Sequence, residues 1–223
     1  MKNFDLQVLD RDWKLLFKSD WALHGSMQLS FEAAVSTKPD TIFVGDKYGS
    51  VVGINGEGKR VFQAYTSIGD VFYGVGDING DGKTEVINAS STGDTVASDF
   101  ATAKALWRFD NFGYPTNRVR VADVNGDGKP EVLLASGTGY LYVLDGAGKV
   151  LWRDRIGVGV NDVLVLPGGR VVYADEGGLV RVADGAGQVT KEWRTEAAPR
   201  LLAACGEQVV AAMADGRLVG FGL

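Results

Sequence analysis

Short apolar segments alternate with turns of glycine and aspartate along the whole chain. The pattern is clearest in residues 118–153, where each segment is rich in Val, Leu or Tyr and is bounded by Gly, Asp or Pro. Such segments are typical of β-strands rather than helices. We therefore predict four strands here, at Arg118–Ala122, Glu131–Ala135, Tyr140–Leu144 and Lys149–Arg153.

The same pattern recurs at a fixed period. A lysine followed by an aromatic residue marks one place in each copy, and these aromatics are 45 residues apart, with a last interval of 41. Glycines recur in the turn between the second and third predicted strands, where they permit a positive φ. The aromatics are Phe17, Phe62, Trp107, Trp152 and Trp193, and the glycines are Gly49, Gly93, Gly139, Gly178 and Gly216.

Four strands in about 40–45 residues make one blade of a β-propeller. A blade cannot bury both of its faces alone, so the copies must stack on one another in a ring. We predict an all-β fold, a single propeller domain over residues 1–223 with about five four-stranded blades. The predicted blades are Met27–Tyr65, Val71–Phe109, Asn117–Arg153, Asp162–Arg194 and a last one from near Arg200.

The last blade has only three predicted strands of its own, at Leu201–Ala204, Val209–Met213 and Leu218–Phe221. We expect Lys14–Lys18 to supply the fourth, so that strands from both termini close the blade and remove an exposed edge. Leu6–Leu9 then remains as a spare strand. This leaves two alternatives open: a displaced strand, or a ring that closes through a partner.

Composition narrows the function classes. The net charge is −5 and the pI is about 5.0, which argues against nucleic acid and anionic membrane surfaces as partners. No apolar run is long enough to span a membrane, and the first residues do not form a secretory signal. Cys205 is the single cysteine, so no internal disulfide is possible, and its apolar neighbours suggest a small core residue.

Two loops carry the strongest chemical signal. They read Asp-x-Asn-Gly-Asp-Gly-Lys-x-Glu and lie 46 residues apart, one in each of two successive blades. Oxygen-bearing side chains occupy loop positions 1, 3, 5 and 9, position 7 offers its carbonyl, and a glycine permits the sharp turn, as Ca²⁺ requires. The predicted ligands are Asp77, Asn79, Asp81, Lys83 and Glu85 in the first loop and Asp123, Asn125, Asp127, Lys129 and Glu131 in the second.

These loops resemble those of FG-GAP or VCBS-type propeller repeats, which occur in integrin α-chains and many bacterial surface proteins. The resemblance implies two structural Ca²⁺ ions at the rim of the ring, and an extracellular or cell-surface location. The family often has Asp at position 9, where this chain has Glu85 and Glu131. The turn Leu144–Trp152 also resembles PQQ-type propeller repeats, although a PQQ enzyme needs a larger ring and further ligands.

The alternative is that both loops are merely turns, since Asp, Asn and Gly are turn residues in any case. Both loops have a glutamate at position 9, and this repetition favours a metal site over a plain turn. The equivalent turns Ser36–Asp40 and Pro167–Gly169 lack the ligand set, and we expect no ion there.

Other chemistry is sparse. His24 is the only histidine, so no Cys–His dyad and no His-rich zinc site is suggested, and no G-x-S-x-G sequence occurs. We predict that the recurrent tryptophans pack between blades rather than bind a sugar or a quinone. Arg118 and Arg120, on a predicted innermost strand, either line the central channel or pair with acids of the loop face.

Aromatic and acidic residues interleave on the predicted face opposite the two loops, and such a surface would suit a protein or glycan ligand. The alternative is that they are ordinary solvent-exposed loop side chains that bind no ligand. They are Trp21, His24, Asp46, Tyr48, Asp94, Phe109, Phe112, Tyr114, Tyr140, Asp175, Glu176 and Asp215.

We therefore expect a non-catalytic, monomeric Ca²⁺-stabilised propeller that serves as a binding scaffold. One alternative is a carbohydrate-binding protein, lectin-like or polysaccharide-degrading. A glycosidase needs two carboxylates facing one cleft, whereas Asp175 and Glu176 are adjacent and point to opposite sides of a strand. Another alternative is an engineered or fragmentary propeller with no ligand of its own.

Overall fold

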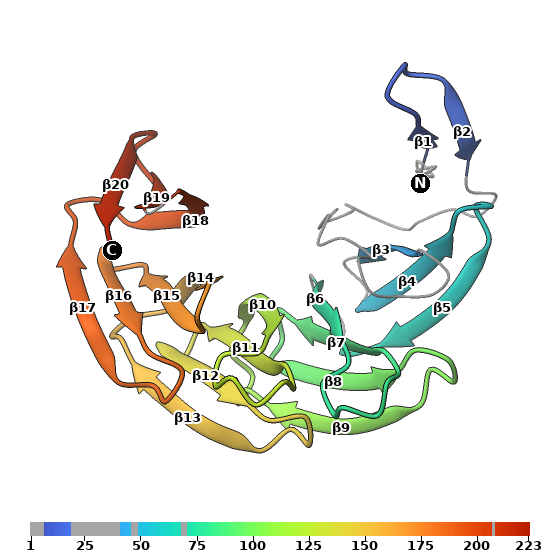
Figure 1. The fold of residues 1–223 in the computed structure, drawn as a ribbon, viewed down its shortest axis with the longest axis horizontal. Coiled ribbons are helices and arrows are strands. Elements are labelled where there is room, and N and C mark those ends of the chain that lie inside the picture. Colours follow the sequence, from blue (N-terminus) through green and yellow to red (C-terminus); the bar gives the residue numbers. More distant parts are fainter. Residues whose placement is uncertain (1–6, 19–40, 46–48, 68–70, 207) are drawn as a thin grey trace.

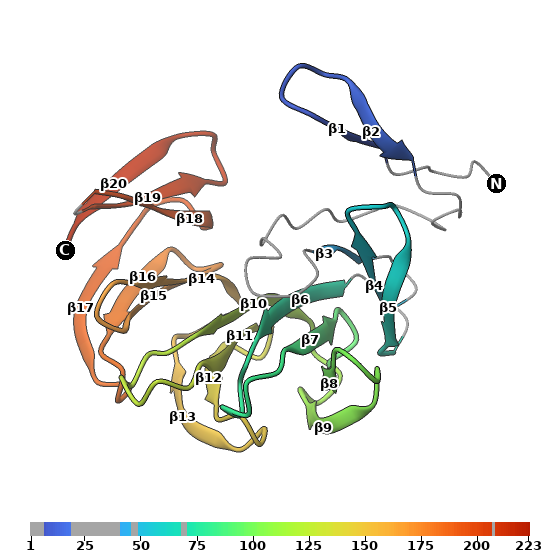
Figure 2. The same ribbon diagram turned by 45° about the vertical axis from the view of Figure 1, so that its right-hand side comes forward.

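The computed structural model describes residues 7–18, 41–45, 49–67, 71–206 and 208–223, and every regular element in them is a β-strand. Antiparallel sheets stand side by side around an arc, and strand pairs run from the inside of the arc to its outside (Figures 1 and 2). This is the arrangement of β-propeller blades, as the repeat predicts. No described helix is long and apolar enough to cross a membrane.

Three complete blades form the middle of the arc. Each has four strands paired in sequence order. They are β6 (Val71–Gly76), β7 (Glu85–Ser90), β8 (Asp94–Asp99) and β9 (Ala105–Asp110); β10 (Thr116–Ala122), β11 (Glu131–Ser136), β12 (Tyr140–Leu144) and β13 (Val150–Arg155); and β14 (Val160–Leu166), β15 (Arg170–Asp175), β16 (Leu179–Ala183) and β17 (Val189–Arg194).

The end sheets have fewer described strands. The first blade consists of β3 (Thr41–Gly45), β4 (Ser50–Asn55) and β5 (Arg60–Tyr65), and its predicted innermost strand lies outside the described residues. The last consists of β18 (Pro199–Cys205), β19 (Gln208–Met213) and β20 (Leu218–Gly222). The hairpin of β1 (Gln7–Leu9) and β2 (Leu15–Lys18) is a sheet of its own.

The hydrophobic core lies between neighbouring sheets. One cluster joins the second blade to the third, another the third to the fourth, and another the fourth to the last. The middle strands β7 and β11 are buried along their whole length, because a sheet on either side covers both of their faces. All five turn glycines identified in the sequence have a positive φ, between +82° and +99°.

The recurrent tryptophans join each blade to the next, which confirms their predicted role. The indole N–H of Trp107 donates to the Gly146 carbonyl at 3.0 Å, and that of Trp152 to the Gly185 carbonyl at 3.0 Å. Each ring lies so close to the second glycine of the same turn that a Cβ there would meet it at 2.7 or 2.6 Å. Packing and one hydrogen bond therefore fix the blade spacing at these positions.

Phe17 of β2 makes the same kind of contact with the first blade, since a Cβ on Gly58 would meet its ring at 2.8 Å. β2 thus has the place of an outermost strand, the role that the sequence predicts for it. β1, which corresponds to the predicted spare strand, pairs with β2. A pairing of β2 with β20 is not among the described strand pairs, so closure of the last blade remains a prediction.

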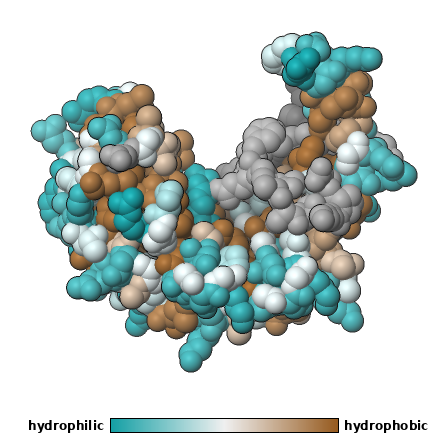
Figure 3. Space-filling view, in the orientation of Figure 1, coloured by the Kyte–Doolittle hydropathy of each residue, from teal (hydrophilic) through white to brown (hydrophobic). Residues whose placement is uncertain are grey.

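The prediction that Cys205 belongs to the core is wrong, because its side chain is exposed. It ends β18, at the end of the arc, where no described blade covers the outer face of the sheet. Leu201 is 52% and Leu218 75% exposed in the same sheet, and Leu16 is 61% exposed in the hairpin. Figure 3 shows hydrophobic surface on both arms of the arc.

Candidate metal loops and the opposite face

The first loop wraps its backbone around the side chain of Asp77. It connects β6 to β7, and the N–H groups of Gly80 and Gly82 donate to the two oxygens of the Asp77 carboxylate at 2.7 and 2.8 Å. The Asp81 N–H donates to the Asn79 side-chain oxygen at 2.8 Å. Gly80 and Gly82 have φ of +75° and +81°, which side-chain-bearing residues rarely adopt. This is the curled loop that the spacing predicts.

The second loop, between β10 and β11, repeats this geometry. Gly126 and Gly128 donate to the two carboxylate oxygens of Asp123 at 2.7 and 2.9 Å, and the Asp127 N–H donates to Asn125 at 2.8 Å. Both glycines again have positive φ. The two loops, in adjacent blades, thus fold in the same way from the same residues.

The acid at position 9 is buried in each loop. Glu85 is 1% and Glu131 3% exposed, and each accepts the backbone N–H of loop position 2, at 3.0 Å from Ile78 and 2.9 Å from Val124. Burial, together with the nearby carboxylates of Asp81, Asp77 and Asp99, raises the pKa of Glu85 to about 7. Burial raises the pKa of Glu131 in the same way. A negative charge at either position is therefore costly without a positive partner.

Other loop side chains lie closer to solvent. Lys83 forms an ion pair with Asp81 at 3.6 Å, and the Asn125 amide donates to Glu131 at 2.9 Å. No three acidic, histidine or cysteine side chains in the described residues converge as a ready metal cluster. The donor set nevertheless fits a hard cation, because each loop combines three carboxylates with an amide oxygen. The ten predicted ligands thus form two separate sets of five, one in each loop, and each set includes one buried glutamate.

The next blade packs directly under each loop. A Cβ on Gly146 would lie 1.9 Å from the Ile78 carbonyl, and one on Gly185 would lie 1.8 Å from the Val124 carbonyl. These glycines belong to the turns that accept the tryptophan hydrogen bonds. A cavity of about 430 Å³ lies between the two loops and is lined by Asn79, Asn125, Asp127, Lys129, Glu131 and Asp145 among others. The loops are therefore part of the contact between blades and still border open space.

Several acids of the opposite face have structural partners. Asp94 pairs with Arg108 at 3.1 Å, and Asp215 with Arg217 at 2.7 Å. Asp175 is 3% exposed, and its side chain accepts the N–H groups of its own turn, from Gly177 and Leu179.

The aromatics of that face divide into packed and exposed rings. Phe109 packs on Tyr142 at 5.1 Å rather than facing solvent, and Arg153 lies over Tyr140 at 5.2 Å. Phe112 and Tyr114 are exposed. Trp21, His24, Asp46 and Tyr48, also predicted for this face, lie outside the described residues.

A buried aspartate that no sequence motif marks holds the inner strands together. Asp162 on β14 is 1% exposed, accepts Arg118 Nε at 2.9 Å and the Leu202 N–H at 2.8 Å, and lies 3.8 Å from Arg120. Its carboxylate thus connects β10, β14 and β18. Both arginines thus pair with Asp162, an acid that is not among those predicted for the loop face.

Comparisons with known proteins support the propeller. A family model described as the lambda-carrageenase beta-propeller domain matches residues 101–179, which include the whole third blade with the second loop and the first two strands of the fourth blade. No curated protein matches the chain.

Solved structures match over most of the chain at low identity. The computationally designed Ika8 protein aligns with a TM-score of 0.77 at 16% identity, over 95% of this chain and 63% of its own. Sqt1 of Saccharomyces cerevisiae aligns with a TM-score of 0.76 at 15% identity, over 94% of this chain and 61% of its own. The designed Ika4 protein aligns with a TM-score of 0.58 at 16% identity, over 69% of this chain and 91% of its own. The chain thus spans less than two thirds of the first two structures, and these likenesses show the fold alone.

Proposed function

We propose that this chain is a single Ca²⁺-stabilised propeller domain and acts as a non-catalytic binding scaffold. The observation that carries the proposal is the pair of loops, each curled around an aspartate and each backed by a buried glutamate. A cation supplies the positive charge that the buried carboxylates lack. The resemblance to calcium-binding propeller repeats supports Ca²⁺ and an extracellular or cell-surface setting.

In each loop, the carboxylates at positions 1, 5 and 9, the amide at position 3 and the carbonyl at position 7 would hold the ion. These are Asp77, Asp81, Glu85, Asn79 and Lys83 in the first loop and their counterparts 46 residues later in the second. Because the turn of the next blade packs beneath each loop, an ordered loop also stabilises the contact between blades. Ligand binding would then use the opposite face, where the turns leave aromatic side chains exposed.

Thermal unfolding tests the metal proposal. We expect CaCl₂ added to chelator-treated protein to raise Tm by about 5–10 °C per site at a hundredfold excess over Kd, and NaCl of equal ionic strength to have no such effect. Asp77→Ala and Asp123→Ala should each remove part of the shift. Asp10→Ala is the matched control: Asp10 accepts two N–H groups of the turn between β1 and β2, away from both loops, so its loss should lower Tm equally with and without Ca²⁺. A Ca²⁺ shift in both loop variants as large as that of the wild type would refute the assignment.

A second candidate is a carbohydrate-active protein, which the match of residues 101–179 to the lambda-carrageenase propeller family favours. Binding of λ-carrageenan, or its depolymerisation, by purified protein would support this candidate. The likeness to two designed propellers is compatible with an engineered chain that has no ligand, which stable monomeric folding without any binding would favour.

A further inference from the structure

The connection between β9 and β10 differs from the equivalent connections of the next two blades. It comprises residues 111–115, whereas the equivalent connections of the next two blades comprise residues 156–159 and 195–198 and are one residue shorter. It also presents two aromatic rings to solvent, with Phe112 71% and Tyr114 52% exposed. The extra residue is not needed to join two blades, since the shorter connections do so.

A buried asparagine holds this connection in one conformation. Asn111 is 1% exposed, and its amide donates to the Tyr114 carbonyl at 2.8 Å and the Pro115 carbonyl at 3.1 Å. Its side-chain oxygen accepts Ser136 Oγ at 2.7 Å, and its backbone N–H donates to the Gly93 carbonyl at 2.8 Å. The two exposed rings are thus presented by a fixed backbone rather than by a loose loop.

The backbone is also strained at the exposed ring. Phe112 has a φ of +56°, in the left-handed region that residues with side chains rarely adopt. In the two shorter connections only a glycine, Gly157, has a positive φ. Neither the strain nor the exposure of the ring stabilises the fold, so both are expected to serve a purpose at the surface.

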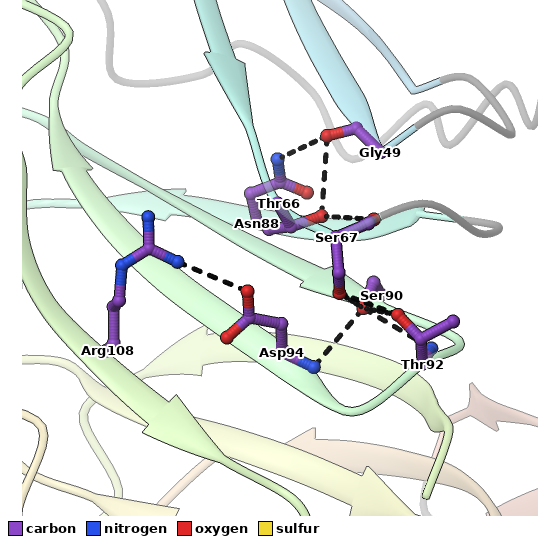
Figure 4. A network of polar contacts seen from close by, with 8 residues as sticks. All are labelled: Gly49, Thr66, Ser67, Asn88, Ser90, Thr92, Asp94 and Arg108. Carbon is purple, nitrogen blue, oxygen red and sulfur yellow. Dashed lines mark hydrogen bonds and ion pairs between the residues drawn. The ribbon is translucent and has the colours of Figure 1, made fainter. Parts of the chain in front are cut away.

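Turns that carry hydroxyl groups flank this connection on both sides. The connection lies between two turns, because a Cβ on Gly93 would meet Gly113 at 2.8 Å and one on Gly137 would meet Pro115 at 2.7 Å. The first turn carries Thr92 in a hydroxyl cluster, with Thr92 Oγ1 2.6 Å from Ser67 Oγ and 3.0 Å from Ser90 Oγ (Figure 4).

The second turn carries Thr138, whose hydroxyl lies 2.7 Å from that of Ser136.

Two carboxylates near the connection already have partners within the protein. Arg108 pairs with Asp94 (Figure 4), and Asp110 accepts the Phe112 N–H at 2.7 Å.

We propose that Phe112 and Tyr114 form a stacking platform for a neutral carbohydrate. Aromatic faces pack on the apolar face of a sugar ring, and the hydroxyls of the flanking turns can exchange hydrogen bonds with sugar hydroxyls. A neutral sugar fits better than an anionic one, because Arg108 is paired with Asp94. The inference rests on the scaffold function proposed above and assigns it a ligand class and a site.

Binding assays test the site directly. We expect at least one neutral hexasaccharide from a panel of cello-, xylo-, manno- and agaro-oligosaccharides to bind in calorimetric titration. Phe112→Ala and Tyr114→Ala should each weaken that binding about tenfold or more. Leu218→Ala is the matched control, since it removes an equally exposed apolar side chain from a distant blade and should leave the affinity unchanged. Absence of binding by every neutral probe, or binding unchanged in both aromatic variants, overturns the proposal.

Two further measurements distinguish a sugar-binding role of the Phe112 ring from a structural one and from a different ligand class. Phe112→Gly should abolish binding without lowering Tm, because glycine adopts the positive φ without strain; a large fall in Tm would mean that the ring is structural. Binding of λ-carrageenan or of a protein partner in place of the neutral probes would likewise overturn the ligand class. The Ca²⁺-dependent Tm shift should be unchanged in all these variants, so failure here is distinguishable from failure of the metal proposal.

Discussion

Glu85 should make the metal-free protein less stable as the pH rises. Its folded-state pKa is about 7, raised from an ordinary 4.5 mainly by burial. A carboxyl with a raised folded-state pKa favours folding below the unfolded value and loses that contribution as pH rises through the folded value. The full difference is worth about 3 kcal/mol, which solvent near the loop reduces to about 1–2 kcal/mol. The free energy of unfolding should therefore fall between pH 5 and pH 8.

The assay is urea unfolding at both pH values, after removal of divalent ions at pH 8 and verification by elemental analysis. Glu85→Gln keeps the shape and an acceptor for the Ile78 N–H but cannot ionise, so it should remove most of the fall. Adding Glu131→Gln should remove more, because the Glu131 pKa is raised in the same direction. With saturating Ca²⁺ the free energy of unfolding of the wild type should no longer fall between pH 5 and pH 8, since the cation favours the ionised form of the glutamate. A Glu85→Gln variant with the full pH dependence of the wild type would refute the reasoning.

Two further predictions concern packing and buried charge. Gly146→Ala should lower the free energy of unfolding by about 2–3 kcal/mol through its backbone clash at 1.9 Å, whereas Gly56→Ala, at the equivalent turn position with no atom within 4 Å, should change it little; equal effects in urea unfolding would contradict this account. Asp162→Ala should cost about 2–4 kcal/mol because it removes the carboxylate that two half-buried guanidinium groups share, and a loss below about 0.5 kcal/mol would show that Asp162 is not essential to the inner strands.

The repeating parts of the molecule could be predicted from the sequence, because a period repeats the same local chemistry. The predicted strand Tyr140–Leu144 coincides with β12, and the neighbouring strands differ from prediction by only one to two residues at their ends. The turn glycines all have the positive φ expected of them. Both loops adopt the curled conformation that their Asp and Gly spacing predicts.

Contacts between blades could not be predicted in this way. Asp162 binds Arg118, which is 44 residues away, and no local signal indicates which acid an inner-strand arginine meets. Cys205 has the apolar neighbours of a core residue, but its exposure depends on which sheet covers its strand. Phe109 and Phe112 are three residues apart, yet Phe109 packs on Tyr142 and Phe112 faces solvent, because Phe109 lies within β9 and Phe112 follows the buried Asn111.

The contact between blades has a direction, and this limits how copies of such a chain can associate. Trp107 and Trp152 each meet a turn of the following blade rather than the tryptophan at their own position in it. The interface is therefore heterologous, and two identical blade faces cannot pair about a two-fold axis as in an isologous dimer. Any assembly through these faces must run head to tail, so it either closes into a cycle or grows into a filament. Polymer formation on mutation is thus a more direct hazard for this architecture than twofold dimerisation.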